Sequence, residues 1–140
     1  MFNKNYEDRL SIWKDFRKEL SSSSDVLLDV ITFYQLAPTV SIHTDPYNQE
    51  TWPSPWELLY ENQYCNFCKI LGICYTLQLT ESFTDQNFEI HIGIDKQNHE
   101  TYYLLSVNSN VIGFNDNYIH IDELPRSIVI ERNYLMPELH

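Results

Sequence analysis

The chain has 140 residues, with nine basic against twenty acidic side chains and a formal net charge of −11. This length is typical of one domain, so we expect a single domain over residues 1–140. The negative charge disfavours direct binding to nucleic acid, where neutralisation of phosphate supplies most of the affinity, and it disfavours an anionic membrane surface in the same way. Only three glycines occur, which argues against glycine-rich phosphate loops, and we expect no cofactor.

The sequence also bears on the cellular compartment. No apolar run reaches the roughly 20 residues of a membrane-spanning helix, and the N-terminus lacks the apolar core of a secretory signal. Cys65, Cys68 and Cys74 are odd in number and close together, which disfavours an internal disulfide framework. We therefore expect a soluble protein of a reducing compartment, either cytoplasmic or incorporated into a virion assembled there.

Two helices are predicted at the N-terminus. Apolar residues recur at helical spacing among charged ones over residues 6–20, and Asn5 can cap this helix. A second apolar segment covers residues 25–36, with Ser24 as its cap. The two segments together predict a helical arm over residues 1–36.

The middle of the chain predicts a long loop and two more helices. Residues 37–52 show no clear period and contain prolines, which indicates a surface loop. Ser54, a proline and then Glu57 form the pattern of a capping box and predict the start of a short helix. A further helix begins near Cys65, and because it is apolar on most sides we expect it to be buried.

The second half of the chain predicts a sheet. Residues 88–94 alternate, so that one face carries apolar side chains and the other carries Glu89, His91 and Gly93. Polar turns separate four further strands, which we expect to continue as a meander at residues 101–107, 111–114, 118–122 and 127–131.

The order of these elements predicts the fold class. Helices come first and strands second, which is typical of an α+β protein. We expect N-terminal helices and a buried central helix packed on an antiparallel β-sheet formed by the C-terminal half, with the helix-plus-sheet core over residues 53–131.

Cys65 is the leading candidate for a catalytic nucleophile. It lies at a predicted helix start, where the positive end of the helix dipole favours thiolate over thiol. A cysteine nucleophile needs a base within hydrogen-bonding reach and a group that holds the base. His91 on the first strand is the candidate base, and Asn108 at the end of the next strand can turn back toward its ring.

With these three residues in this order, the chain resembles the transglutaminase-like and papain-like cysteine domains. The resemblance covers residues 52–114, and the strand LLSVN, which ends in Asn108, is similar to the family strand that ends in the third residue. It implies that Cys65 attacks an acyl carbon, that His91 moves the proton and that Asn108 orients the ring. The reaction would be thiol-dependent acyl hydrolysis or acyl transfer.

A second resemblance favours a different class of function. The segment WPSPWEL, which begins at Trp52, resembles small proteins of tailed bacteriophages. The chain also departs from the cysteine family, with Tyr64 where a glycine commonly precedes the cysteine and with Ile92 and Gly93 where an aromatic residue often follows the histidine. The competing hypothesis is therefore a non-catalytic structural or assembly protein, such as a bacteriophage virion component, that binds protein partners. Whether the chain is an enzyme stays open between the two.

Structural interpretations of the same residues also stay open. Cysteines on an apolar helix are commonly small core residues. Asn108 is followed by Ser109 and Asn110, which is typical of an ordinary turn. The Cys65–Cys68 spacing also fits a thioredoxin-like redox motif, although the segment before it is predicted to be a helix and not a buried strand. One such pair is weak evidence for zinc, and we expect no metal site. Trp52 and Trp56 are interpreted as core anchors rather than as walls of a cleft.

Overall fold

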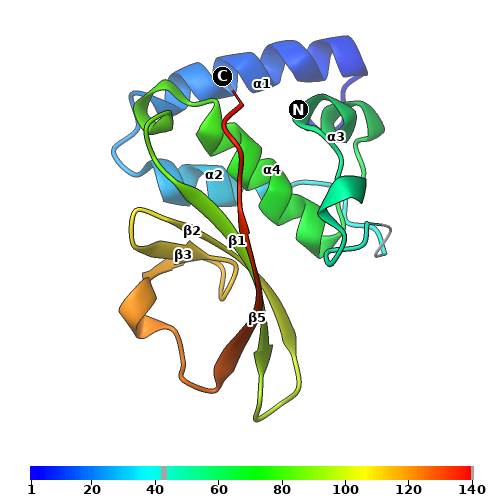
Figure 1. The fold of residues 1–140 in the computed structure, drawn as a ribbon. Coiled ribbons are helices and arrows are strands. Elements are labelled where there is room, and N and C mark those ends of the chain that lie inside the picture. Colours follow the sequence, from blue (N-terminus) through cyan, green and yellow to red (C-terminus); the bar gives the residue numbers. More distant parts are fainter. Residues whose placement is uncertain (42–43, 140) are drawn as a thin grey trace.

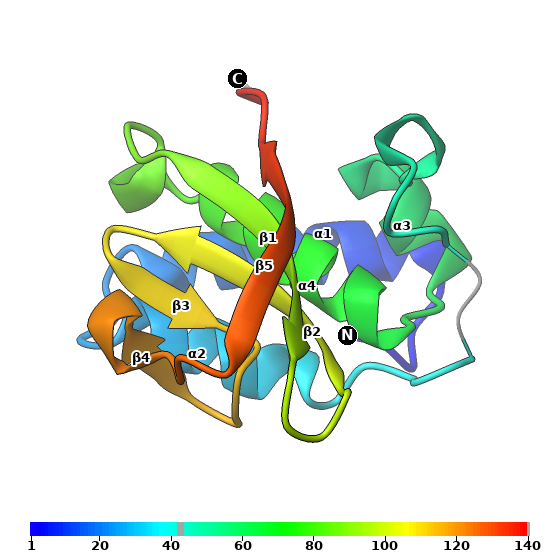
Figure 2. The same cartoon turned by 60° about the horizontal axis from the view of Figure 1, so that its bottom comes forward.

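The computed structural model describes residues 1–41 and 44–139. In this part of the chain, four α-helices precede a five-stranded antiparallel sheet that the C-terminal half forms. Figures 1 and 2 show the helices gathered on one side of the sheet. The predicted α+β fold is confirmed.

The first two helices begin close to where the sequence predicts. α1 (Tyr6–Leu20) is capped by Asn5, whose side chain accepts a backbone hydrogen bond of 2.9 Å from the first turn. α2 (Val26–Tyr34) is shorter than expected, and its cap is Asp25 instead of Ser24. A carboxylate at this position both accepts a backbone N–H and complements the positive end of the helix dipole.

The N-terminal helices pack into the core of the protein. Leu20, Val30 and Tyr34 are buried in the same hydrophobic cluster as residues of the central helix and of the sheet. The helices therefore share one core with the C-terminal half.

Two helices follow the long loop. α3 (Pro55–Glu61) begins with the predicted capping box, in which Ser54 Oγ accepts from the backbone N–H of Glu57 and Glu57 Oε1 accepts from that of Ser54, both at 3.2 Å. α4 (Asn66–Gln78) has Cys65 as its N-cap, and nearly all of its residues are buried. This is the predicted central helix.

The sheet has the strand order β4-β3-β2-β1-β5, and every neighbouring pair is antiparallel. Its strands are β1 (Phe88–Asp95), β2 (Thr101–Val107), β3 (Asn110–Ile112), β4 (Tyr118–His120) and β5 (Ile128–Leu135). The described residues also form three short 3₁₀ helices: η1 (Gln49–Thr51), η2 (Glu81–Phe83) and η3 (Ile121–Glu123).

The last strand departs from the predicted meander. β5 does not pair with β4 but with β1, at the opposite edge of the sheet. To reach that edge the chain passes from β4 through η3 across the face that the helices leave open (Figure 1). The strand pairs along residues 128–135, which is longer than expected.

The two faces of the sheet have different environments. Phe88, Ile90 and Leu105 are buried in the cluster that contains α4, so they form the helix face. Successive residues of a strand point to opposite faces. His91 and Ser106 therefore lie on the outer face, away from α4.

The long loop before α3 ends in a tryptophan that packs against rings of the core. Two of its residues, Ile42 and His43, lie outside the described residues. The Trp52 ring at the end of the loop has its centroid 4.9 Å from that of Phe67 and 4.9 Å from that of Tyr134, which agrees with the core-anchor interpretation. Trp56 is different, because it is 50% exposed.

Candidate functional site

Cys65 caps α4 but is sealed inside the protein. Its backbone carbonyl accepts the first intrahelical hydrogen bond, from Lys69 N at 3.0 Å, and the residue has no exposed surface. Its neighbours include Cys68 in the next turn and Tyr103 on the helix face of β2. Burial and the nearby Cys65 and Asp45 raise the pKa of Tyr103. The predicted position at a helix start is therefore correct, but no substrate can reach the sulfur in this structure.

The other two thiols are held in their protonated form. A hydrogen bond to Cys65 and burial raise the pKa of Cys68, which also donates to Thr44 Oγ1 at 3.4 Å. Burial raises the pKa of Cys74. All three cysteines are unlinked and fully buried. A reactive thiol or a redox pair needs a lowered pKa and some exposure, which is the opposite environment.

His91 lies on the outer face of the sheet. Its Nε2 is 2.8 Å from Ser106 Oγ on β2, and its Nδ1 hydrogen-bonds to Asn133 Oδ1 on β5. Because a carbonyl oxygen only accepts, Nδ1 carries the proton, and in the neutral ring Nε2 accepts from the serine hydroxyl. The ring thus links three neighbouring strands.

Asn108 lies in the turn between β2 and β3. It has a φ of 51°, and its exposed backbone carbonyl accepts from Asn110 Nδ2 at 3.3 Å. His91 is paired with Leu104. Asn108 is four residues further along the strand, a separation of about 13 Å at the usual rise per residue.

The structure therefore does not assemble Cys65, His91 and Asn108 into one site. Cys65 belongs to the cluster on the helix face, whereas the ring of His91 is bound to residues of the outer face. The side-chain alternation of β1 causes this separation, because the apolar face of the strand packs on α4 and the histidine must point away.

Ser106 and Asn133 were missed as partners of His91. The predicted hairpin of β1 and β2 was enough to identify Ser106 as a neighbour of His91. In the register Ser106 is opposite Glu89, and it lies diagonal to His91 on the same face. Asn133 had no local signal, because it reaches the histidine only through the pairing of β5 with β1.

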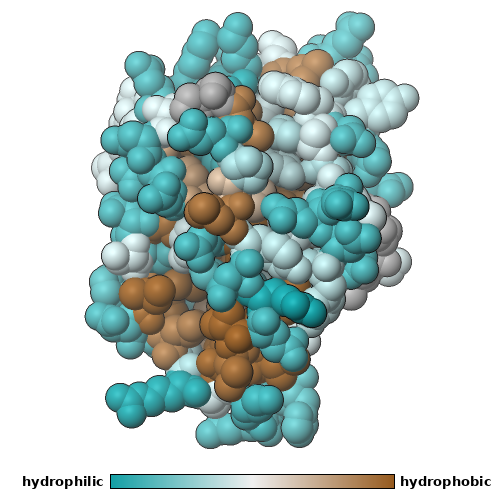
Figure 3. Space-filling view, viewed as in Figure 1, coloured by the Kyte–Doolittle hydropathy of each residue, from teal (hydrophilic) through white to brown (hydrophobic). Residues whose placement is uncertain are grey.

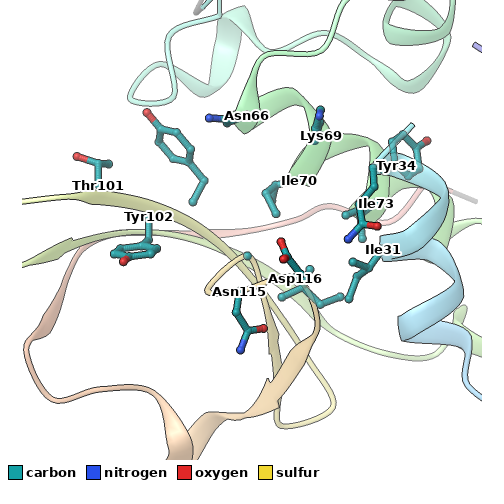
Figure 4. A pocket seen from close by; sticks show the side chains of 14 residues that line it. Ile31, Tyr34, Asn66, Lys69, Ile70, Ile73, Thr101, Tyr102, Asn115 and Asp116 are labelled. Atoms are coloured by element: carbon teal, nitrogen blue, oxygen red, sulfur yellow. The ribbon is translucent and has the colours of Figure 1, made fainter. Parts of the chain in front are cut away.

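A cleft of about 340 Å³ opens between α2, α4 and the loop after β3 (Figure 4). Ile70 and Ile73 of α4 give it an apolar floor, and Asp116 points into it from the loop. Lys69, on the rim, extends away from Asp116 (Figure 4). The charged groups of the cleft thus do not converge on one point.

An apolar patch lies where the chain passes from η3 into the edge strand β5. Figure 3 shows apolar side chains over the start of β5 and over η3, where Ile121, Val129 and Ile130 are exposed. The edge strand is interrupted by a register shift against β1 and carries the charges of Glu131 and Arg132. Such features disfavour edge-to-edge pairing with another chain.

The acidic side chains lack basic partners. Within residues 1–41 and 44–139 no carboxylate lies within ion-pair distance of a lysine or arginine. The one carboxylate contact with a histidine in these ranges joins Asp122 Oδ2 to His120 Nδ1 at 3.4 Å, and this nitrogen already accepts from the backbone N–H of Asp122. The net charge of −11 is therefore not neutralised locally, and its field extends into solvent.

Three of the four arginines instead lie over aromatic rings. The distances from Cζ to the ring centroid are 4.3 Å for Arg17 over Trp13, 5.9 Å for Arg9 over Tyr6 and 5.9 Å for Arg132 over Tyr47. Aromatic faces attract guanidinium groups electrostatically. These arginines thus contact aromatic rings, Arg9 and Arg17 in a buried or half-buried setting and Arg132 at the surface, and none of them pairs with a carboxylate of the described residues.

Comparison with known proteins gives no family. No protein-family model and no curated protein matches the chain. Among the described residues, no three histidine, cysteine or acidic side chains are grouped so that they could hold a metal ion, and no helix has the length and apolarity to cross a bilayer.

Proposed function

We propose that this chain is a non-catalytic binding protein, whose acidic surface docks on a basic protein partner within a larger assembly. The observation that carries the proposal is the lack of any lysine or arginine ion pair to the twenty carboxylates in the part of the chain that the structure describes. An unneutralised surface charge steers association with a partner of opposite charge and contributes to specificity. The resemblance of WPSPWEL to small bacteriophage proteins suggests a virion as the assembly.

The burial of the thiols supports binding over catalysis. Acyl transfer at Cys65 requires an exposed sulfur and a base within hydrogen-bonding reach. Cys65 has no exposed surface, and His91 lies across the sheet with both ring nitrogens bonded. Thiol-dependent hydrolysis would need a rearrangement of α4 against the sheet.

Alkylation of the folded protein tests the non-catalytic part of the proposal. Iodoacetamide at pH 7, with the modified residues identified by mass spectrometry, should label Cys65 no faster than Cys68 and Cys74, and all three only after unfolding in urea. The two other cysteines are internal controls, since they are buried to the same degree. Selective, rapid labelling of Cys65 in the folded protein would restore the enzyme hypothesis.

Binding to a basic peptide tests the docking part. The probe is a fluorescent peptide that alternates arginine and serine, compared with the same peptide carrying neutral citrulline. We expect binding of the arginine peptide at 50 mM salt, weakened by about tenfold or more at 500 mM because salt screens surface charges. Equal affinity for the two peptides would refute docking by charge, as would failure to bind the arginine peptide.

A further inference from the structure

α3 presents two adjacent ridges to solvent. Trp56 and Tyr60 are four residues apart, as are Glu57 and Glu61, so each pair lies on one line along the helix. Trp56 is 50% and Tyr60 68% exposed, and both glutamates are exposed. An aromatic ridge therefore lies beside an acidic one.

α1 supplies the other wall of a groove. α1 and α3 are neighbours (Figures 1 and 2), and the Tyr6 ring meets Tyr60 edge-on with centroids 5.2 Å apart. Trp56 is held from below by the buried Trp13, at 5.6 Å and in the same edge-on manner. We call this space, of about 310 Å³, the α1–α3 groove; it is lined by Tyr6, Trp56, Glu57, Tyr60 and Glu61.

The two carboxylates keep free acceptor capacity. One oxygen of Glu57 accepts from the backbone of Ser54 in the capping box, which fixes the carboxylate and leaves its other oxygen available. Among the described residues, the Glu61 carboxylate has no hydrogen-bond or ion-pair partner. The groove thus combines aromatic faces with negative charge.

We infer that the α1–α3 groove binds an arginine side chain of the basic partner, an inference that rests on the proposed function. A guanidinium group stacks on aromatic rings and donates in a planar fork to carboxylates, whereas a lysine ammonium is a compact and strongly hydrated charge. The chain's own three cation–π contacts, in the described residues, are all made by arginine. The volume of the groove is at the lower end for ligand pockets and suits a side chain.

The nearest internal cation does not neutralise the groove. Arg9 lies against the Tyr6 ring, but it is buried and donates to the backbone carbonyls of Lys4, Leu59 and Tyr60. These carbonyls take up its N–H groups, so Arg9 makes no ion pair with Glu57 or Glu61. The exposed side of the groove remains negative.

Variants of α3 test the location. Fluorescence anisotropy with the arginine–serine peptide at 50 mM salt compares the double variant Glu57→Gln, Glu61→Gln with Asp15→Asn, Asp85→Asn, which changes the net charge equally at two exposed sites away from the groove. Glutamine keeps an acceptor for the capping box. We expect about tenfold weaker binding for the α3 variant and about twofold for the control.

Two further measurements test the chemistry. Tyr60→Ala should weaken binding of the arginine peptide by about fivefold, because an exposed cation–π contact is lost. In nuclear magnetic resonance spectra, the indole N–H signal of Trp56 should shift with the arginine peptide and stay in place with the citrulline peptide. A lysine–serine peptide should bind more weakly than the arginine peptide. Circular dichroism checks that each variant is folded.

The outcomes separate this inference from the proposed function. If both charge variants lose affinity equally, or the Trp56 signal does not move, the partner binds elsewhere and the groove inference fails while docking by charge stands. If the lysine peptide binds as tightly, the assignment of arginine is overturned. If the unmodified protein binds no basic peptide, the proposed function itself fails.

Discussion

The ring of Tyr34 in α2 lies directly against Gly72 in the middle of α4. A Cβ atom at Gly72 would be 2.5 Å from Tyr34 Cε1 and 2.9 Å from Cζ, far closer than carbon atoms pack. The Tyr34 hydroxyl is 2.9 Å from Thr76 Oγ1, one turn further along α4, so the ring cannot easily move aside. The lack of a side chain at Gly72 sets how closely the two helices approach.

Gly72→Ala should therefore destabilise the protein. Overpacking a core costs about 1–3 kcal/mol, and the better helix propensity of alanine returns about 1 kcal/mol. We expect a net loss of up to about 2 kcal/mol in the free energy of unfolding, measured by urea denaturation. Ser11→Ala, at an exposed position in α1, is the control and should change little. A Gly72→Ala protein as stable as the original would show that the contact is not tight.

Thr76→Val should be more costly than the same change at Thr80. Thr76 Oγ1 accepts from Trp13 Nε1 at 2.9 Å and bonds to the Tyr34 hydroxyl, and all three residues are buried. Valine would leave two buried polar groups unpaired, for a loss of about 2–4 kcal/mol. Thr80 is equally buried, but its hydroxyl bonds only to the Thr76 carbonyl at 2.7 Å, so Thr80→Val should cost about 1 kcal/mol. Equal losses in urea denaturation would contradict this account of the network.

The sequence predicts the helix starts well because their signals are local. The capping box of Ser54 and Glu57 is contained within four residues, and each partner satisfies the other's backbone. Asp25 took the place of Ser24 because neighbouring polar residues can both cap, and only the exact path of the chain decides between them. The pairing of β5 with β1 has no local signal, since alternation in β5 suits either edge of the sheet.

The separation of Cys65 from His91 has a cause that the strand pattern already contains. Alternation predicts that Ile90 and His91 point to opposite faces, and the aliphatic face has to pack on the buried helix. Any residue at the start of that helix, Cys65 included, is then separated from His91 by the sheet. The identity of the true partner, Asn133, depends on the register of β5, which is set by contacts over 42 residues of sequence.

The buried tyrosines and cysteines make the protein sensitive to alkali. Burial raises the pKa of Tyr34 to about 12 from its ordinary value of 10. Between these values the unfolded chain loses a proton that the folded chain retains, so the stability that is fully present below pH 10 falls as the pH rises toward 12. The contribution of Tyr34 is about 1.4 kcal/mol per pH unit over this window.

Tyr34→Phe isolates this contribution. Urea denaturation at pH 9, 10 and 11 should show a shallower decline between pH 10 and 11 for Tyr34→Phe than for the original protein. Buried groups that both proteins share, such as Cys74 and Tyr75, give a common background because burial raises the pKa of each. Ser11→Ala, an exposed change that removes no titratable group, should keep the original slope. An unchanged slope in Tyr34→Phe would mean that the Tyr34 hydroxyl is not sealed from water.

The hydrogen bonds of His91 should stabilise the sheet without making Ser106 a nucleophile. The order of serine hydroxyl, imidazole and amide oxygen is that of a hydrolase triad. However, Ser106 lies on an inner strand that is paired on both sides, so its surrounding backbone N–H groups are used in the ladder and cannot bind an oxyanion. The geometry thus supplies a base but not the charge stabilisation that acyl transfer needs.

Ser106→Ala and Asn133→Ala test this distinction. Each should lower the free energy of unfolding by about 0.5–1.5 kcal/mol, the usual worth of one hydrogen bond. Glu89→Gln, on the same face of the sheet, is the control and should have a smaller effect because no side-chain bond to these residues is removed. A fluorophosphonate probe should not label the folded protein. Labelling that disappears in Ser106→Ala would identify Ser106 as a catalytic serine, because only an activated hydroxyl attacks the probe, and would contradict the non-catalytic function proposed above.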